Sequence, residues 1–253
     1  MLPVTLDVRS NIKAVTRGLT RLEQQFVPIA TAKALTFTAE TVRDAEQWKM
    51  MRVFDRPTRW TINSMYIWPA TVRNQSSAVY LKDRLGMGGG AGTPAAVYLL
   101  PQIHGGTRPI KRFEHRLAPF MAGHRFAMPG AGVALDAHGN IARGTITKIL
   151  SQVRALGNGQ DQTKAGKARN RKKAGPQYFW PKPGSGLKPA IYKREGRRIV
   201  PALVFTSRAN YRPRFPFYDF GLAVARAKFP DHFERQLARE IRKALAETYR
   251  IAA

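Results

Sequence analysis

The chain has 253 residues, of which 43% are hydrophobic and 10% aromatic, so it can bury enough apolar surface to fold and is not disordered throughout. The absence of cysteine excludes disulfide frameworks, thiol nucleophiles and cysteine-based zinc sites, and it favours synthesis in a cytoplasm. Forty-three Lys and Arg against 16 Asp and Glu give a formal net charge of +27, which indicates a polyanionic partner, either nucleic acid or the acidic surface of another protein.

The N-terminal region predicts a short strand followed by two helices. Residues 3–9 alternate weakly between apolar and polar side chains, as a strand does. Residues 10–25 carry apolar side chains at helical intervals, with Ser10 as the N-cap. Residues 27–51 predict a second helix, with Pro28 in its first turn. This helix is rich in alanine and apolar on two sides, which is typical of close packing within a domain or against a neighbouring subunit.

Residues 53–71 read VFDRPTRWTINSMYIWPAT and combine aromatic residues, cations and prolines. Pro57 and Pro69 end regular structure. Between them, four side chains favour a pleated surface, namely Trp60, Ile62, Tyr66 and Trp68. We therefore expect a loop-and-strand segment at the edge of a sheet, in which Asp55 pairs with a nearby arginine. Trp60 and Trp68 are expected to be buried, either in the core or against a neighbour.

The middle of the chain predicts short elements separated by loops. Residues 76–83 alternate as a strand does, and the glycine-rich run at 86–94 predicts a flexible loop without the Gly-Lys-Ser/Thr of a phosphate-binding loop. Residues 95–106 predict a strand or a short helix, and residues 108–120 a short helix. Residues 130–150 predict a hairpin that leads into a helix near 145–155, with turn chemistry from Asp136, Gly139 and Asn140.

Residues 157–175 form a basic segment that has no apolar side chain larger than alanine. Because such a segment cannot bury a face, we expect a mobile loop or linker. Six cations lie within ten residues of it, and they are candidate contacts for nucleic acid or for an acidic partner: Lys164, Lys167, Arg169, Arg171, Lys172 and Lys173.

The C-terminal third predicts strands and then a helix. Three segments between 177 and 207 have the composition of strands, with a hairpin turn at Glu195-Gly196. A helix is expected over 231–249, with Asp231 and Glu234 as a capping box after Pro230, and an apolar stripe at Phe233, Leu237, Ile241 and Leu245. The element order predicts a single α+β domain over residues 1–253, with a central, mostly antiparallel sheet, two N-terminal helices and a C-terminal amphipathic helix.

Residue patterns typical of catalysis are weak throughout the chain. None of the five histidines has a metal-binding spacing, and Glu114 and His115 are adjacent, so their side chains point apart. The acidic residues are thinly spread, and no serine has a G-x-S-x-G setting. We therefore expect no catalytic residue, no cofactor and no metal, and a nuclease with an unrecognised metal site is the least favoured function. No apolar run approaches the roughly 20 residues of a membrane span, so we expect no contact with a membrane.

Several segments, in order along most of the chain, resemble structural proteins of tailed bacteriophages. They are VPIATAKALTFTAETVRDA, FDRPTRWTINSMYIWPAT, VYLKD, HGGTRP, GVALDAHGNIARGTI, IVPALVF and RFPFYD before a terminal helix. The layout is similar to that of the minor tail protein Z family and other tail-completion or neck proteins. The resemblance implies a virion protein, made in the host cytoplasm and placed at the head–tail junction or tail. It also implies a homo-oligomeric ring that joins portal or adaptor proteins to tail proteins, without enzymatic activity.

A ring subunit needs surfaces that are covered only in the assembled particle, and Tyr, Trp and Arg are favoured anchors of such interfaces. This makes the segment around residues 54–68 a candidate interface, with Phe54, Asp55, Arg56, Trp60, Tyr66 and Trp68 as its contact residues. The alternative function is sequence-nonspecific binding of DNA, in which the basic loop contacts phosphates. The two readings overlap, because a neck encloses the leading end of the packaged genome.

Overall fold

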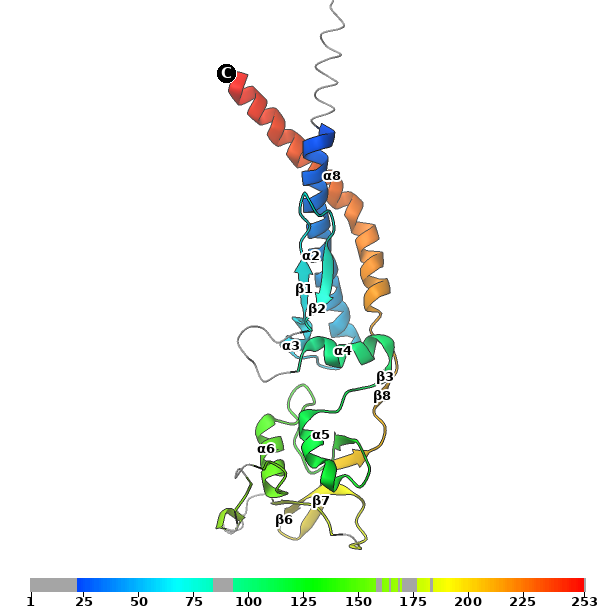
Figure 1. Ribbon diagram of the computed structural model, residues 1–253, viewed down its shortest axis with the longest axis vertical. Coiled ribbons are helices and arrows are strands. Elements are labelled where there is room, and N and C mark those ends of the chain that lie inside the picture. The colour runs from blue at the N-terminus through cyan, green and yellow to red at the C-terminus, as the bar shows by residue number, and fades with distance from the viewer. Residues whose placement is uncertain are drawn as a thin grey trace, which may run out of the picture. The chain divides into compact units, whose positions relative to one another are not determined.

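A computed structural model describes residues 22–83, 93–157, 161–163, 165–167, 169, 177–182 and 184–252 (Figure 1). Its helices and antiparallel strands confirm the predicted α+β class. We expected one domain, and the contacts within the chain gather in two compact units. Unit 1 holds the described residues of Met1–Val53, Arg59–Ala96 and Phe215–Ala253, and unit 2 those of Phe54–Thr58 and Val97–Arg214.

Two long helices, α2 (Val27–Val53) and α8 (Phe217–Ala252), build unit 1. A π-helical turn, η1 (Leu22–Phe26), precedes α2. The helices run antiparallel, because Lys33 near the start of α2 pairs with Glu240 of α8, whereas Glu46 further along α2 lies next to Gly221 near the start of α8. Figure 1 shows α8 on one side of α2 and a two-stranded hairpin on another, so two sides of α2 are covered by elements of its own unit.

The α2 side of this helix pair is a row of buried residues at every fourth position: Ala30, Ala34, Thr38, Val42, Glu46 and Met50. A spacing of four aligns side chains along one ridge of a helix, and small residues let a second helix approach closely. Thr38 Oγ1 lies 3.0 Å from His232 Nδ1, and Lys33 Nζ lies 2.6 Å from Glu240 Oε1. These polar contacts join the two helices at defined positions along their length.

Glu46 is the exception in this row, since its side chain is fully buried and neither carboxyl oxygen has a hydrogen-bond partner among the described residues. Burial raises the pKa of Glu46 to about 8, against a smaller opposing effect of Lys49. The carboxyl group is therefore protonated at neutral pH.

The hairpin of unit 1 consists of β1 (Met65–Trp68) and β2 (Ala78–Leu81), which pair antiparallel and contact α2. Both strands lie inside segments predicted to be strands. Trp60 and Ile62 lie instead in a short helix, α3 (Arg59–Ile62), so their predicted pleated placement is wrong. The backbone N–H of Asn63 donates to the carbonyl of Arg59 at 2.9 Å, and this local turn outweighs the β-propensity of the two side chains.

Unit 2 contains most of the sheet structure. Its four-stranded antiparallel sheet has the order β4-β7-β6-β5, and β3 pairs with β8 in a separate two-stranded sheet. The strands are β3 (Gly106–Thr107), β4 (Phe126–Pro129), β5 (Gln177–Phe179), β6 (Ala190–Glu195), β7 (Arg198–Thr206) and β8 (Asn210–Tyr211). Its helices include α4 (Ala95–His104), most of which lies in unit 2, α5 (Arg112–Leu117), the 3-10 turn η2 (Ala118–Phe120) and α6 (Arg143–Gln152).

The core of unit 2 lies between one face of the four-stranded sheet and two helices. Helix α5 contributes Leu117 to this core, and helix α6 contributes Ile149 and Leu150. All three side chains are buried against Ile191 and Leu203 of the sheet. Inward-facing strand residues alternate with outward ones, because successive side chains of a strand point to opposite faces.

Most predicted elements of unit 2 are confirmed. Helix α4 lies inside the segment 95–106 that predicted a strand or a short helix, α5 lies inside the predicted 108–120 helix, and the Glu195-Gly196 turn joins β6 to β7. Asp136 and Asn140 close the predicted turn, because the N–H of Asp136 donates to the carbonyl of Asn140 at 2.8 Å. Strand β4 was not predicted, since its residues, Phe126-Ala127-Met128-Pro129, are all apolar and show no alternation.

The predicted start of the C-terminal helix is wrong. Helix α8 begins at Phe217 and has Pro230 in its interior, so Asp231 and Glu234 do not form an N-terminal capping box. Proline removes one backbone hydrogen bond and favours a bend, and Figure 1 shows α8 changing direction along its length. Residues 217–229 pack on α2, and this packing keeps α8 helical on both sides of Pro230.

Several predictions fall outside the described residues: the strand at 3–9, the helix at 10–25 before Leu22, and most of the loops at 86–94 and 157–175. Within the described part of the chain, no helix combines the length and the apolarity that crossing a membrane requires.

Candidate protein-interaction site

The structure divides the six predicted interface residues between the two units. Phe54, Asp55 and Arg56 belong to unit 2, whereas Trp60, Tyr66 and Trp68 belong to unit 1. The residues are contiguous in sequence, but the contacts of the first three differ from those of the last three.

The first half is held inside unit 2 by its own contacts. Arg56 has a left-handed backbone (φ 45°), and its guanidinium bonds both carboxylate oxygens of Asp55, with Nε 3.1 Å from Oδ1 and Nη2 3.0 Å from Oδ2. The predicted pairing of Asp55 with an arginine is therefore confirmed, and the hydrogen bond from Arg56 lowers the pKa of Asp55. His138 Nδ1 lies 2.9 Å from the carbonyl of Arg56, and the guanidinium of Arg214 lies 5.0 Å from the ring centre of Phe54. These contacts indicate a structural role.

The second half leads into an exposed aromatic face on the β1–β2 hairpin. Strand register places Tyr66 directly opposite Tyr80, and Trp68 opposite Ala78. The two tyrosine rings stack with centroids 5.3 Å apart and planes 22° apart. Tyr66, Trp68 and Tyr80 keep 39%, 60% and 45% of their surface exposed. We call these three residues the aromatic face.

The other face of the same hairpin fixes the aromatic face in its outward position. Met65 is buried, and the remaining alternate residues, Ile67, Val79 and Leu81, are half-buried on the side that contacts α2. The backbone N–H of Ala70 donates to Oγ1 of Thr36 on α2 at 3.1 Å, which ties the end of β1 to the helix. A one-residue slip would turn the aromatic side chains inward, so burial of Met65 specifies the register.

Trp60 on α3 is also 60% exposed. Burial of Trp60 or Trp68 in the core of this chain, one of two expectations, is therefore wrong, and burial against a neighbour stays a prediction. Among the described residues, every exposed large aromatic side chain lies in unit 1, the others being Phe37, Trp48 and Tyr218. Large exposed apolar patches are uncommon on soluble monomers and mark contact sites.

Tyr80 is the residue of this face that sequence reasoning missed. The alternation of residues 76–83 places it on the same face as Ala78, but only the pairing of β2 with β1 brings it onto Tyr66. An exposed aromatic in a predicted strand next to another aromatic strand is the signal that could have found it.

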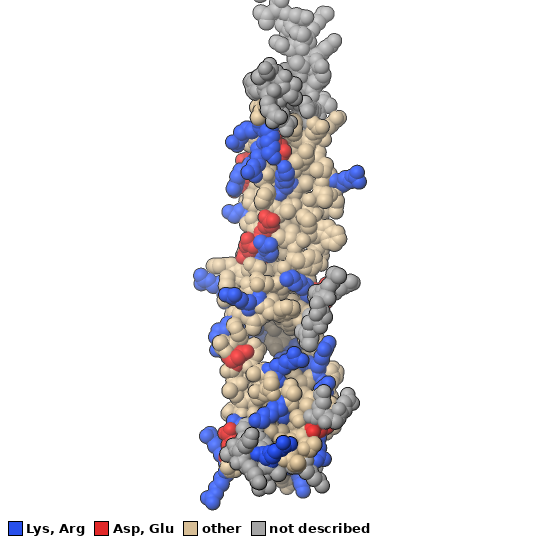
Figure 2. Space-filling model, turned by 90° about the vertical axis from the view of Figure 1, so that its left-hand side faces the viewer, with Lys and Arg blue, Asp and Glu red and all other residues tan. Residues whose placement is uncertain are grey.

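Unit 2 carries most of the positive charge. It holds 24 Lys and Arg against 5 Asp and Glu, a formal net charge of +19 out of the +27 of the chain. Figure 2 shows Lys and Arg side chains outnumbering Asp and Glu on the visible face. Of the predicted basic contacts, Lys167 and Arg169 are exposed, whereas Lys164, Arg171, Lys172 and Lys173 lie outside the described residues.

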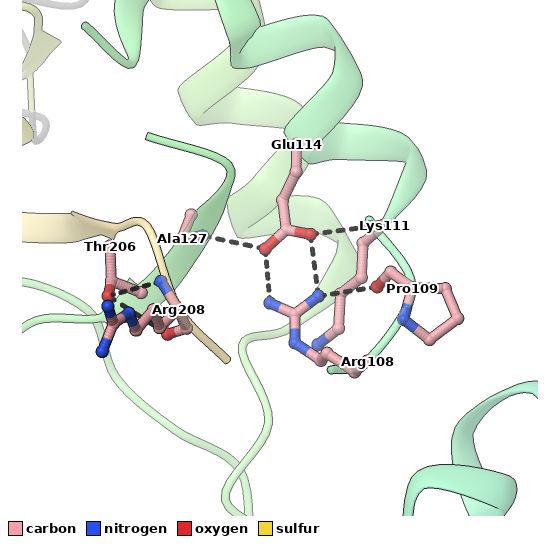
Figure 3. A network of polar contacts seen from close by, with 7 residues as sticks. All are labelled: Arg108, Pro109, Lys111, Glu114, Ala127, Thr206 and Arg208. Carbon is pink, nitrogen blue, oxygen red and sulfur yellow. Dashed lines mark hydrogen bonds and ion pairs between the residues drawn. The ribbon is translucent and has the colours of Figure 1, made fainter. Parts of the chain in front are cut away.

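The strongest polar network of unit 2 surrounds Glu114, which is 1% exposed (Figure 3). The Arg108 guanidinium bonds both carboxylate oxygens, at 2.8 Å for Nη1–Oε2 and 2.5 Å for Nη2–Oε1. The backbone N–H groups of Lys111 and Ala127 donate to the same carboxylate at 2.7 and 2.8 Å. Burial alone would raise the pKa of Glu114, but these donors outweigh burial and lower it.

Arg108 also stacks on a neighbouring ring, with its guanidinium carbon 4.9 Å from the centre of Phe126. The network therefore joins the segment before α5 to strand β4. Because every acceptor position of Glu114 is occupied from within the chain, the carboxylate has a structural role. His115, next to it in sequence, is exposed, which confirms that the two side chains point apart.

Among the described residues, no group of three or more His, Asp or Glu side chains could hold a metal ion. Comparison with family models, curated proteins and solved structures gave no match for this chain. The aromatic face and the charge of unit 2 are therefore the features from which a function can be argued.

Proposed function

We propose that this chain is a structural protein of the tailed-bacteriophage virion, which forms an oligomeric ring at the head–tail junction and joins portal-side to tail-side components. The observation that carries the proposal is the aromatic face, in which Trp68 is 60% exposed on a hairpin held against α2. The resemblance of segments along the chain to tail-completion and neck proteins supplies the kind of assembly.

The composition of the aromatic face suits a permanent interface between proteins. Tyr and Trp offer large contact areas and lose little conformational freedom on binding, because each has only two side-chain torsions. The stacked pair of Tyr66 and Tyr80 further restricts both rings before any partner arrives. A preorganised aromatic surface of this kind is well suited to contact between neighbouring subunits or stacked rings.

The proposal is tested first by the location of the protein. Particles purified from a lysate of the producing host should contain this chain, and quantitative mass spectrometry should find it at a fixed ratio to the portal protein. An abundant host cytoplasmic protein measured in the same sample gives the level of contamination. If the chain is present only at that level, it is not a virion component.

A further inference from the structure

The β6–β7 hairpin of unit 2 ends in a basic tip with the sequence Lys193-Arg194-Glu195-Gly196-Arg197-Arg198. These six residues, which we call the basic tip, hold four cations and one acid. They close the turn between two paired strands, with Gly196 in the left-handed conformation (φ 58°) that the turn requires. Unlike most of the loop at 157–175, the basic tip lies wholly within the described residues.

The acid of the basic tip is already paired. Lys193 Nζ lies 2.7 Å from Oε1 of Glu195, and this pair uses one cation. Arg194, Arg197 and Arg198 are exposed, and none has a carboxylate partner among the described residues. The basic tip therefore presents three unneutralised guanidinium groups within five residues.

The register of the strands distributes these cations around the hairpin. Glu195 lies opposite Arg198, and Arg194 lies opposite Ile199. Directly opposite residues share a face and successive residues alternate, so Arg194 and Arg198 point to opposite faces of the sheet. Arg197 lies in the turn between them. A polyanion that wraps around or passes across the end of the hairpin can therefore meet a guanidinium group from either side.

Arg194 is held in position by aromatic stacking. Its guanidinium carbon lies 5.1 Å from the ring centre of Phe179 on β5, and Phe179 stacks on Tyr192 with centroids 6.0 Å apart. A stacked guanidinium keeps its N–H donors free at the edge of its plane, where they can bond phosphate oxygens in pairs. Stacking also reduces the side-chain freedom that Arg194 loses on binding.

The composition of the basic tip favours phosphate over an acidic protein surface. The buried centre of a protein interface is apolar and aromatic. On the two strands that carry the basic tip, the exposed large apolar side chains among the described residues are Ile199, at 39%, and Val204, at 41%, and every exposed large aromatic of the described part lies in unit 1. Contacts with a nucleic-acid backbone are instead mainly charged hydrogen bonds from Arg and Lys to phosphate oxygens.

We propose that the basic tip binds the phosphate backbone of nucleic acid without sequence preference. This goes beyond the proposed role of the aromatic face, because it assigns a different partner to a different unit. It also differs from the expectation that the loop at 157–175 is the contact, since the residues involved are Arg194, Arg197 and Arg198.

The test measures binding of the full chain to fluorescently labelled 20-base-pair DNA duplexes of two unrelated sequences, by anisotropy, over a range of salt concentrations. The variant is R194Q/R197Q/R198Q. The matched control, R226Q/K228Q/R239Q, removes the same charge from exposed positions of α8 in unit 1. Thermal unfolding of all three proteins checks that the substitutions leave the fold intact.

We expect the wild-type chain to bind both duplexes equally. Each lost phosphate contact lowers the dependence of log K on log salt by about 0.9, so the tip variant should be shallower by about 3 and the control unchanged. Equal slopes for the tip variant and the control would overturn the proposal, as would a wild-type chain that prefers one duplex more than tenfold. Binding of poly-L-glutamate with no binding of DNA would also overturn it, in favour of an acidic protein partner.

Discussion

A methyl group added at Gly221 of α8 would stand 3.0 Å from Oε1 of Glu46 on α2, so the carboxyl group of Glu46 lies directly against the backbone of the partner helix. This carboxyl is buried and unpaired among the described residues, in a row otherwise made of small or apolar side chains and one threonine. Ionisation of Glu46 would leave a buried charge without a partner, so it would destabilise the helix pair of unit 1.

The position of Glu46 predicts that the stability of unit 1 falls as pH rises. The pKa of Glu46 is about 8 in the folded chain and 4.5 as its ordinary value, so between these values the folded state holds a proton that the unfolded state has lost. The free energy of unfolding should therefore decrease from about pH 4.5 to about pH 8, with a slope of up to about 1.4 kcal/mol per pH unit from this group.

Urea unfolding at several pH values checks this. His232 and the Lys33–Glu240 pair lie on the same helices, so the informative quantity is the difference between wild type and Glu46→Gln. The free energy of unfolding of Glu46→Gln, relative to that of wild type, should increase as pH rises through this range. Glu40→Gln, at a half-buried position of the same helix, is the control and should track wild type. A constant difference between wild type and Glu46→Gln would contradict the assignment.

Removal of the Arg108 side chain should strongly destabilise unit 2. Arg108→Ala leaves the buried Glu114 carboxylate without its guanidinium, and breaking a buried pair of this kind costs about 3–5 kcal/mol. Denaturant unfolding should show this as a lower midpoint with the same slope. Arg56→Ala, which breaks the exposed Asp55–Arg56 pair, is the comparison and should change the midpoint little. Similar effects of the two substitutions would mean that the Glu114 network does not stabilise the fold.

The hydroxyl of Thr36 should control the order of the hairpin that carries the aromatic face. Thr36→Val preserves the shape of the side chain and removes the acceptor for the backbone N–H of Ala70. The lost hydrogen bond is worth about 0.5–1.5 kcal/mol, and amide hydrogen exchange should become faster at Ala70 and along β1. Thr41→Val is the control, because the Thr41 hydroxyl bonds only within α2, to the carbonyl of Phe37. Unchanged exchange at Ala70 in Thr36→Val would show that the hairpin does not depend on this contact.

Local sequence patterns predicted correctly those elements whose structure is determined by their own residues. Residues 27–51 have a helical composition throughout, Glu195-Gly196 has turn chemistry, and residues 76–83 alternate. The start of α8 could not be predicted in this way. Pro230 with an acidic residue after it is a typical beginning of a helix, and only the packing of Phe217–Phe229 on α2 extends α8 through it.

The sequence predicted the candidate site only in part, because tertiary packing also determines which of its residues are exposed and which lie together. Exposure of Trp60 and Trp68 follows from tertiary packing, and so does the assignment of Phe54 to a different unit from Trp60. The contribution of Tyr80 required the pairing of β1 with β2. The basic tip has four cations around a turn in the sequence, but its strand-like composition predicts only a hairpin, and the run at 164–173 is denser in charge.

The central claim is that the aromatic face joins this protein to its neighbours in the virion, and the most direct measurement is assembly with Trp68→Ala supplied in place of the wild-type chain. Trp68 is 60% exposed, so the variant should fold normally, whereas loss of an interface anchor costs about 2 kcal/mol or more. Electron microscopy of the lysate should then show heads and tails that are not joined, and the titre of infectious particles should fall. Leu187→Ala, which truncates an exposed apolar residue of unit 2, should leave both unchanged. A folded Trp68→Ala chain that yields joined, infectious particles in wild-type numbers would contradict the claim.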